Sequence, residues 1–224
     1  MTETTIEPYL RNAWYLGAWS DEVADGGHLA RTIMSQPLVF FRGPDGKAAA
    51  LEDRCCHRGA PLTHGNVVEA GIECGYHGLI FDGSGQCVSI PGADSIPPQT
   101  KVRSYPVVER QEFIWIWMGD AERADESKII DYPHHDDHAK WPHCKQWLPI
   151  ESNYMMMVDN LMDLTHLTYV HAKTIGGNPQ AHSRAEVDSR ETDTGAHYIR
   201  WMEDATPPPT YQKAVGFEGN VDRW

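Results

Sequence analysis

Four potential metal ligands, arranged as two close pairs, are the feature that most constrains this chain. The first pair is Cys55-x-His57 and the second is Cys74-x-x-His77, with sixteen residues between the pairs. Two thiolates and two imidazoles can hold a [2Fe-2S] cluster in which the cysteines ligate one iron and the histidines the other. Each pair then has to lie on a tight loop, and the two loops have to meet. The fold must be built around that meeting point.

A zinc site is the alternative for these four residues, because structural zinc is also bound by two cysteines and two histidines. In zinc modules the cysteines usually form one pair and the histidines the other, whereas here each pair is mixed. A cluster with two chemically different irons accounts for the mixed Cys/His pairs better than a zinc site does. Cys56 is a possible competing ligand, but Cys55 has the required spacing to His57, so we expect Cys56 to be a packed thiol.

The first part of the chain, residues 8–119, is predicted to be an all-β domain. Apolar runs separated by turn residues indicate two hairpins, one with its turn at residues 43–46 and one with its turn around Ser84. Residues 113–117 are aromatic or β-branched, which is typical of a strand.

The composition becomes polar and acidic after residue 119, and this change predicts a linker over residues 120–144 and a second domain over 145–224. The second domain is predicted to begin with a helix over 152–173. The linker holds His134, His135 and His138, with His143 close behind. These histidines could bind a metal, but an acidic, histidine-rich linker is more often solvated, and we expect no metal there.

The charge balance narrows the choice of partners. Thirty-two acidic residues against 19 basic ones give a formal charge of −13, which repels nucleic acid and anionic membranes. The longest apolar run, residues 113–118, is far shorter than the roughly 20 residues of a membrane-spanning helix. Residues 1–12 have no apolar stretch that would indicate a secretory signal. We therefore expect a cytoplasmic protein with no nucleic-acid or membrane partner.

A second group of possible ligands follows in the motif Asp163-x-x-His166-x4-His171. Two histidines and a carboxylate are the ligand set of mononuclear non-haem Fe(II) oxygenases. On an unbroken helix, residues five apart lie about 140° away from one face and about 7.5 Å along the axis, so His166 and His171 would not share a metal easily. We therefore predict that the helix breaks or bulges between Leu167 and His171.

These motifs resemble those of a known family. Residues 54–62 and 74–78 resemble the two ligand loops of Rieske non-haem iron aromatic oxygenases, large subunit, although proline is commoner than cysteine at position 56. The motif from Asp163 to His171 resembles the iron-binding segment of the same subunits. Residues 12–15 and 159–171 carry a narrower resemblance, to the branch with the oxygenase components of vanillate O-demethylase and toluenesulfonate methyl-monooxygenase.

The resemblance implies an α+β protein, with an N-terminal all-β Rieske domain followed by an incomplete α+β catalytic domain of the helix-grip, START-like type. It implies that His166 and His171 bind a mononuclear Fe(II). Asp163 would connect a cluster histidine to an iron-ligating histidine, and Asn160 matches a position near the iron. The family forms head-to-tail trimers, so we expect a homotrimer in which His77 of one subunit approaches Asp163 of the next.

Respiratory Rieske proteins share the four cluster ligands but differ nearby. Their disulfide would fall at Ala60 and Tyr76 here, and their hydroxyl donors to the cluster would fall at Leu79 and Phe81. Fewer hydrogen bonds to the cluster favour a lower reduction potential. A low potential suits a centre that passes electrons towards oxygen activation.

The function implied is that of a terminal oxygenase component, which inserts one oxygen atom of O2 into a methyl or methoxy carbon of an aromatic acid. NAD(P)H electrons would arrive through a reductase, or through a ferredoxin and a reductase. The alternative is a Rieske ferredoxin-like electron carrier with an accessory domain. The third iron ligand of this family is a carboxylate from a late helix, and no candidate precedes Trp224. We therefore expect the chain to be a fragment that lacks this ligand.

Overall fold

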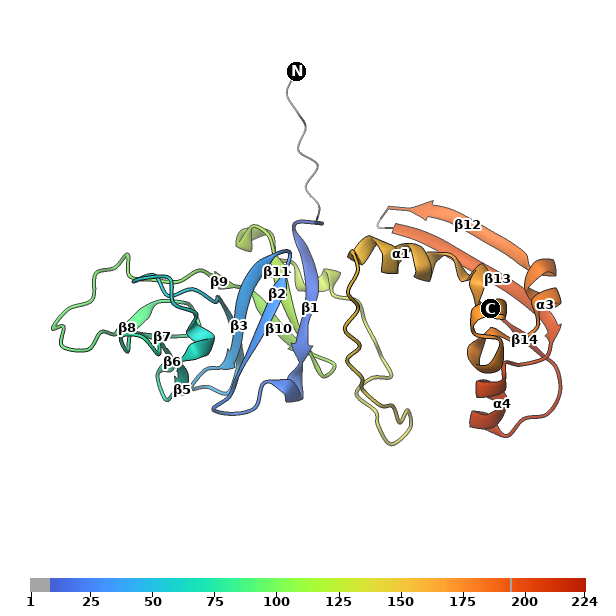
Figure 1. Cartoon of the computed structure of the whole chain (residues 1–224), viewed down its shortest axis with the longest axis horizontal. Coiled ribbons are helices and arrows are strands. Elements are labelled where there is room, and N and C mark those ends of the chain that lie inside the picture. The colour runs from blue at the N-terminus through green and yellow to red at the C-terminus, as the bar shows by residue number, and fades with distance from the viewer. Residues whose placement is uncertain (1–8, 194) are drawn as a thin grey trace, which may run out of the picture. The chain divides into compact units, whose positions relative to one another are not determined.

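The computed structural model describes residues 9–193 and 195–224, and it divides the chain into two compact units between Lys145 and Gln146 (Figure 1). Residues 120–144, which we expected to form a linker, cluster with the first unit. The finer boundaries at residues 119 and 144 stay predictions.

The first unit is built from three antiparallel sheets, with strand orders β1-β11-β10, β2-β3-β4-β9 and β5-β6-β7-β8. The β-rich character predicted for this half is confirmed, as are both hairpins. The strands are β1 (Ala13–Trp19), β2 (His28–Ile33), β3 (Gln36–Arg42), β4 (Ala48–Glu52), β5 (Asn66–Val68), β6 (Gly71–Glu73), β7 (Ile80–Phe81), β8 (Cys87–Ser89), β9 (Ser104–Tyr105), β10 (Val107–Arg110) and β11 (Phe113–Met118). Short 3-10 turns lie at Ser20–Glu22, Leu62–His64, Ala121–Arg123 and Glu126–Lys128.

Strand β3 contributes to two apolar cores, because side chains alternate between the faces of a strand. Leu38 and Phe40 pack in a cluster with Ile114 of β11, and Val39 and Phe41 pack in a second cluster on the opposite face. Both phenylalanines are fully buried, and burying such a side chain stabilises a fold by roughly 1.5–3 kcal/mol. The second cluster also contains the thiols of the two cysteine ligands, so the core itself holds the base of the first candidate site.

The turn between β10 and β11 consists of two residues, Gln111 and Glu112, which both have positive φ values, 55° and 62°. Two left-handed residues in a row are typical of a type I′ hairpin turn, which usually contains Asn or Gly. Non-glycine residues rarely adopt this conformation. Both side chains bind the segment that follows residue 130, as described below.

The second unit combines helices with one antiparallel sheet of order β12-β13-β14. Its helices are α1 (Tyr154–Met162), α2 (Leu167–Val170), α3 (Pro179–Arg184) and α4 (Pro209–Val215), with a 3-10 turn at Leu164–His166 and a π turn at Ala172–Gly176. Its strands are β12 (Glu186–Thr192), β13 (Gly195–Ala205) and β14 (Val221–Arg223). The predicted α+β class is confirmed by this combination with the all-β first unit.

Within the described residues, no helix is both long enough and apolar enough to cross a bilayer. The prediction of a single helix over residues 152–173 is wrong. The observed helix α1 ends at Met162, and helical turns begin again after Asp163. Three methionines of α1, Met155, Met156 and Met162, are exposed in this chain.

Candidate functional site

The two predicted ligand loops have the same backbone hydrogen bonds. In the first loop, the Cys55 N–H donates to the Ala60 carbonyl (2.8 Å) and the Gly59 N–H donates to the Cys55 carbonyl (2.9 Å). In the second loop, the Cys74 N–H donates to the Leu79 carbonyl (2.8 Å) and the Gly78 N–H donates to the Cys74 carbonyl (2.9 Å). Each loop therefore folds back on its own cysteine.

One glycine in each loop makes this geometry possible. Gly59 and Gly78 have φ values of +72° and +71°, a region that glycine enters without steric cost. The first loop is also closed at its base, where the Asp53 carboxylate accepts hydrogen bonds from the Thr63 N–H (2.8 Å) and hydroxyl (2.6 Å). Hydrogen bonds within the chain thus fix both loops.

The loops also touch one another closely. A Cβ atom added to Gly75 would lie 2.3 Å from the His64 carbonyl oxygen, and one added to Gly65 would lie 1.8 Å from the Glu73 carbonyl oxygen. These contacts leave no room for a side chain at either position. The glycines therefore let the two loops meet at one point, as the motif spacing predicts.

The four ligand side chains sort by burial. Cys55 and Cys74 are buried in the apolar core, whereas His57 and His77 are exposed, with ring centroids 4.6 Å apart. Burial, followed by the neighbouring Cys74 thiol, raises the pKa of Cys55 to about 11. A thiol in this setting needs a bound cation to lose its proton at neutral pH. Two buried sulfurs beneath two exposed imidazoles fit a [2Fe-2S] cluster with a cysteine iron inside and a histidine iron outside.

The surroundings of the loops agree with this fit. Leu79 and Phe81 are buried and apolar, so they add no hydroxyl donor. Cys56 is exposed, so the expectation of a packed thiol there is wrong; the loop turns its side chain away from the core that holds Cys55.

The second group of predicted ligands lies where α1 ends. Asp163 leaves the helical conformation (φ −106°, ψ 93°), and its Oδ1 atom accepts hydrogen bonds from the Thr165 N–H (2.9 Å) and hydroxyl (2.6 Å). These hydrogen bonds lower the pKa of Asp163. A side chain that caps the next turn in this way competes with continuation of the helix. The Asp-x-Thr sequence is therefore the signal that the prediction of one long helix overlooked.

His166 has a fixed tautomer in this arrangement. Its Nδ1 atom lies 2.7 Å from the Asp163 carbonyl oxygen. Because a carbonyl oxygen can only accept, Nδ1 carries the proton and the Nε2 lone pair is available for a metal. Histidine ligands are usually oriented by such a hydrogen bond from the other ring nitrogen.

His171 lies close to His166, with ring centroids 5.5 Å apart. We predicted a break between Leu167 and His171, but α2 continues regularly to Val170 and the His171 N–H still donates to the Leu167 carbonyl (3.0 Å). The predicted position is therefore wrong. The helix bends before these residues, at Asp163, and again at His171, whose φ of −108° precedes the π turn.

The two histidines fit part of the ligand set of a mononuclear iron, and both are half-buried. Asp163 is exposed. Asn160 lies on an exposed part of α1, three positions before Asp163. The roles assigned to these four residues from the sequence stay predictions.

An apolar cavity of about 600 Å³ lies in the second unit beside this group, with Leu164 and Leu167 among its lining residues. Arg200 and Arg223 also line it. Their guanidinium groups both contact His182, at 3.4 Å and 3.0 Å. Burial and these two positive charges lower the pKa of His182.

Neither arginine has a carboxylate within 4 Å among the described residues, so the cavity presents two positive charges to an anion. Sequence reasoning missed both arginines. They stand on separate strands, and no local motif links them.

Two family models match the chain. The Rieske [2Fe-2S] domain matches residues 13–106, and the vanillate O-demethylase oxygenase C-terminal domain matches residues 150–224. The first match lies within the first unit and the second match within the second unit.

Individual proteins match over nearly the whole chain. The toluene-4-sulfonate monooxygenase system iron-sulfur subunit of Comamonas testosteroni is 42% identical, covering 96% of this chain and 62% of that protein. The vanillate O-demethylase oxygenase subunit of Pseudomonas sp. strain HR199 is 40% identical, covering 96% and 60%.

A solved structure has the same fold. The crystal structure of dicamba monooxygenase with non-haem iron and dicamba is 35% identical and superposes with a TM-score of 0.78, covering 97% of this chain and 62% of that one. The chain thus spans about three fifths of the length of the proteins it matches.

Proposed function

The chain belongs to the family of Rieske non-haem iron oxygenase components, and we propose that the protein is the terminal oxygenase component of a monooxygenase. The proposed substrates are aromatic acids with a methyl or methoxy group, as the names of its relatives indicate. One oxygen atom of O2 would enter a C–H bond, and the other would leave as water after taking two electrons and two protons. A hydroxylated methoxy carbon is a hemiacetal, which loses formaldehyde.

The observation that carries this proposal is the proximity of His166 and His171, whose ring centroids lie 5.5 Å apart in a broken helix. A Rieske electron carrier, the alternative function, has no use for a second pair of converging imidazoles. When bound, the cluster supplies single electrons and the mononuclear iron supplies open positions for O2.

The residues of the chain hold and orient these groups. Cys55 and Cys74 would hold the inner end of the cluster and His57 and His77 its outer end. His166 and His171 would hold the iron, with His166 oriented by the Asp163 carbonyl.

We assign Asp163 to the step between the two centres. Its Oδ1 atom is held by Thr165, which fixes the direction of the carboxylate. Both Asp163 and His77 are exposed, so each is accessible to a neighbouring copy of the chain. In the proposed head-to-tail trimer, His77 of one subunit would donate a hydrogen bond to Asp163 of the next, and Asn160 would lie near the iron.

Arg200 and Arg223 support an acidic substrate. Guanidinium groups bind carboxylates and sulfonates through paired hydrogen bonds. The apolar remainder of the cavity suits an aromatic ring. The acid group would thus lie at the arginines and the ring against the apolar side chains, including the two leucines that flank His166.

Isotope labelling tests the function. The protein is supplied with NAD(P)H, a reductase, ¹⁸O₂ and either 4-toluenesulfonate or vanillate. We expect one ¹⁸O atom in the hydroxymethyl product, or formaldehyde released in proportion to the vanillate consumed. Reduction and reoxidation of the cluster with neither product would support the electron-carrier alternative instead.

A further inference from the structure

The β10–β11 turn is attached to the segment that follows it in the first unit. The Gln111 side-chain amide donates to the Asp131 carboxylate (2.6 Å) and accepts from the Tyr132 N–H (3.0 Å). The neighbouring Glu112 points the other way along the segment, into a group of imidazoles. We call Glu112, His135, His138 and His143 the turn cluster.

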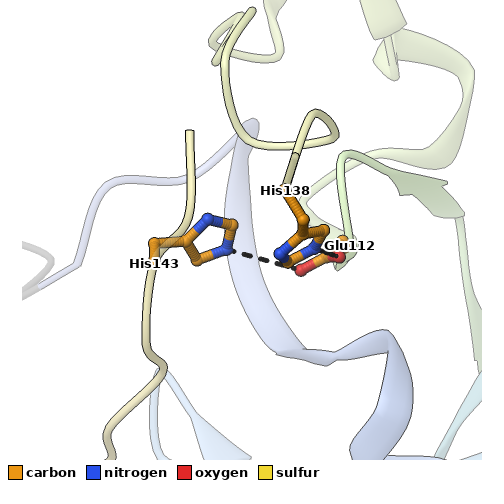
Figure 2. Close-up of side chains that lie close together, drawn as sticks. All are labelled: Glu112, His138 and His143. Atoms are coloured by element: carbon orange, nitrogen blue, oxygen red, sulfur yellow. Dashed lines mark hydrogen bonds and ion pairs between the residues drawn. The ribbon is translucent and has the colours of Figure 1, made fainter. Parts of the chain in front are cut away.

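The atoms of the turn cluster converge on the Glu112 carboxylate. Nδ1 of His135 lies 3.8 Å and Nε2 of His143 lies 3.7 Å from its Oε2 atom. Nε2 of His138 is hydrogen-bonded to the other oxygen, Oε1. Figure 2 shows the carboxylate of Glu112 beside the ring of His138, with dashed lines joining Glu112 to His138 and to His143.

Two of these atoms, Nδ1 of His135 and Nε2 of His143, are buried without a hydrogen-bond partner among residues 9–193 and 195–224. The Oε2 atom of Glu112, which both face, has the ammonium group of Lys145 at 3.3 Å. Buried polar atoms are nearly always paired, so two unpaired imidazole nitrogens that face one carboxylate oxygen need an explanation. A bound cation would satisfy both nitrogens and the carboxylate at once.

The spacing of these atoms fits a small divalent ion. Neighbouring ligand atoms of a tetrahedral site with bonds of about 2.0 Å are about 3.3 Å apart, slightly less than the distances from Glu112 to His135 and His143. The ligand atoms of Glu112, His138 and His143 lie within 4.8 Å of one another. Three imidazoles and a carboxylate are nitrogen and oxygen ligands of the kind that Zn²⁺ accepts.

We propose that the turn cluster binds one Zn²⁺-like ion, which fastens residues 131–145 to the β10–β11 turn. The site uses none of the four [2Fe-2S] ligands and neither His166 nor His171, and it does not depend on the proposed function. It reverses the expectation from the sequence that the histidine-rich segment is only solvated.

The Lys145 ammonium group also binds the carboxylate of the turn cluster. Its Nζ atom lies 3.3 Å from Oε2 of Glu112 and 3.0 Å from the Asp21 carboxylate. Metal binding would leave Lys145 paired with Asp21 alone. The ammonium group therefore competes with the metal, and replacing it should strengthen metal binding.

The test is a titration with Co²⁺ and Zn²⁺ of the protein that already carries its [2Fe-2S] cluster. The parent protein carries His166→Ala and His171→Ala, so that the mononuclear site cannot take up the added ion. We expect one equivalent of Co²⁺ to bind with the visible bands of a tetrahedral site and without thiolate charge-transfer bands, and to be displaced by Zn²⁺. His143→Ala and His135→Ala should each weaken binding at least about tenfold, the loss typical of removing even an outer-shell partner.

His134→Ala is the matched control. This histidine lies in the same segment but stacks on Trp141 (4.3 Å between ring centroids), outside the turn cluster. The His134→Ala variant should bind Co²⁺ as tightly as the parent does, and the Lys145→Met variant should bind Co²⁺ more tightly. Absorbance of the [2Fe-2S] cluster shows that each variant is folded.

Two results would overturn the proposal. One is the absence of saturable binding by the parent below about 1 μM. The other is equal binding by the parent and the His135 and His143 variants. A second measurement guards against misfolded variants, since added Zn²⁺ should raise the thermal unfolding midpoint of the parent and of His134→Ala but not that of His143→Ala.

Discussion

The imidazole rings of His57 and His77 lie with centroids 4.6 Å apart, at the exposed end of two loops whose cysteines are buried. The backbone hydrogen bonds and close contacts of the two loops thus bring the four ligands together. Stability measurements can test this arrangement.

Replacing Gly75 with alanine should disrupt the site. The added Cβ would lie 2.3 Å from the His64 carbonyl oxygen, so the backbone that carries Cys74 and His77 has to move. We expect a loss of about 3 kcal/mol in the free energy of unfolding, together with low occupancy of the [2Fe-2S] cluster. Denaturant unfolding and iron analysis measure the two effects.

The control for Gly75→Ala is Gly92→Ala. Gly92 has a φ of +74° but open space around its Cα, so its substitution isolates backbone strain, which costs about 1–2 kcal/mol. Similar losses in the two variants would contradict the close contact between the loops.

The Asp163→Asn variant should distinguish the structural role of Asp163 from its proposed role in electron transfer. Asparagine can still accept the Thr165 hydrogen bonds through its carbonyl oxygen, so we expect the thermal midpoint and the iron content to remain near those of the parent. Product formation should be lost, because the negative charge between the two centres is gone. Asp163→Ala should lose both stability and product formation.

Asp125 provides a matched control for these variants. It accepts hydrogen bonds from the Ser127 N–H (3.0 Å) and hydroxyl (2.7 Å), the same arrangement in the first unit. Asp125→Ala should lower stability without loss of turnover. Retained turnover in Asp163→Asn would sink the assignment of Asp163.

Much of the site was predictable, because its ligands are close in sequence. The spacing from Cys55 to His57 and from Cys74 to His77 determines each loop almost by itself. Glu112 could not be predicted, since it meets His138 and His143 across a long stretch of chain, and its turn has neither Asn nor Gly to mark it. The prediction of one long helix was wrong because it used helix propensity alone. It left out the tendency of Asp163 to cap the turn that follows it.

The ion pair between Glu109 and Arg42 should make stability depend on pH. Both guanidinium Nη atoms bind the carboxylate, at 2.9 and 2.8 Å, and this hydrogen bonding lowers the pKa of Glu109. A lowered pKa in the folded state contributes stability above the ordinary value of 4.5, and this contribution disappears as the pH falls through the folded-state pKa.

Glu109→Gln should therefore cost on the order of 1 kcal/mol at pH 7 and progressively less below pH 4.5. Urea unfolding of both proteins across this range measures the difference. A double-mutant cycle with Arg42→Met isolates the pair. A cost that is constant with pH would contradict the coupling.

Arg200→Gln and Arg223→Gln should weaken binding of acidic substrates. Each removes one positive charge from a cavity whose lining includes no Asp or Glu side chain among the described residues. We expect KM for an aromatic acid to rise at least about tenfold in either variant, the effect of losing a charge-assisted hydrogen bond of about 1.4 kcal/mol. The corresponding uncharged amide or ester is the control substrate, and its KM should change little. Equal changes for both substrates would contradict a role for these arginines in binding the acid group.

Iron analysis is the most direct test of the central claim that the chain serves two metal centres. The account predicts about three iron atoms and two acid-labile sulfides per chain, falling to about two iron atoms in the His166→Ala, His171→Ala variant, with the cluster spectrum unchanged. About two iron atoms in both proteins would contradict a mononuclear iron held by His166 and His171.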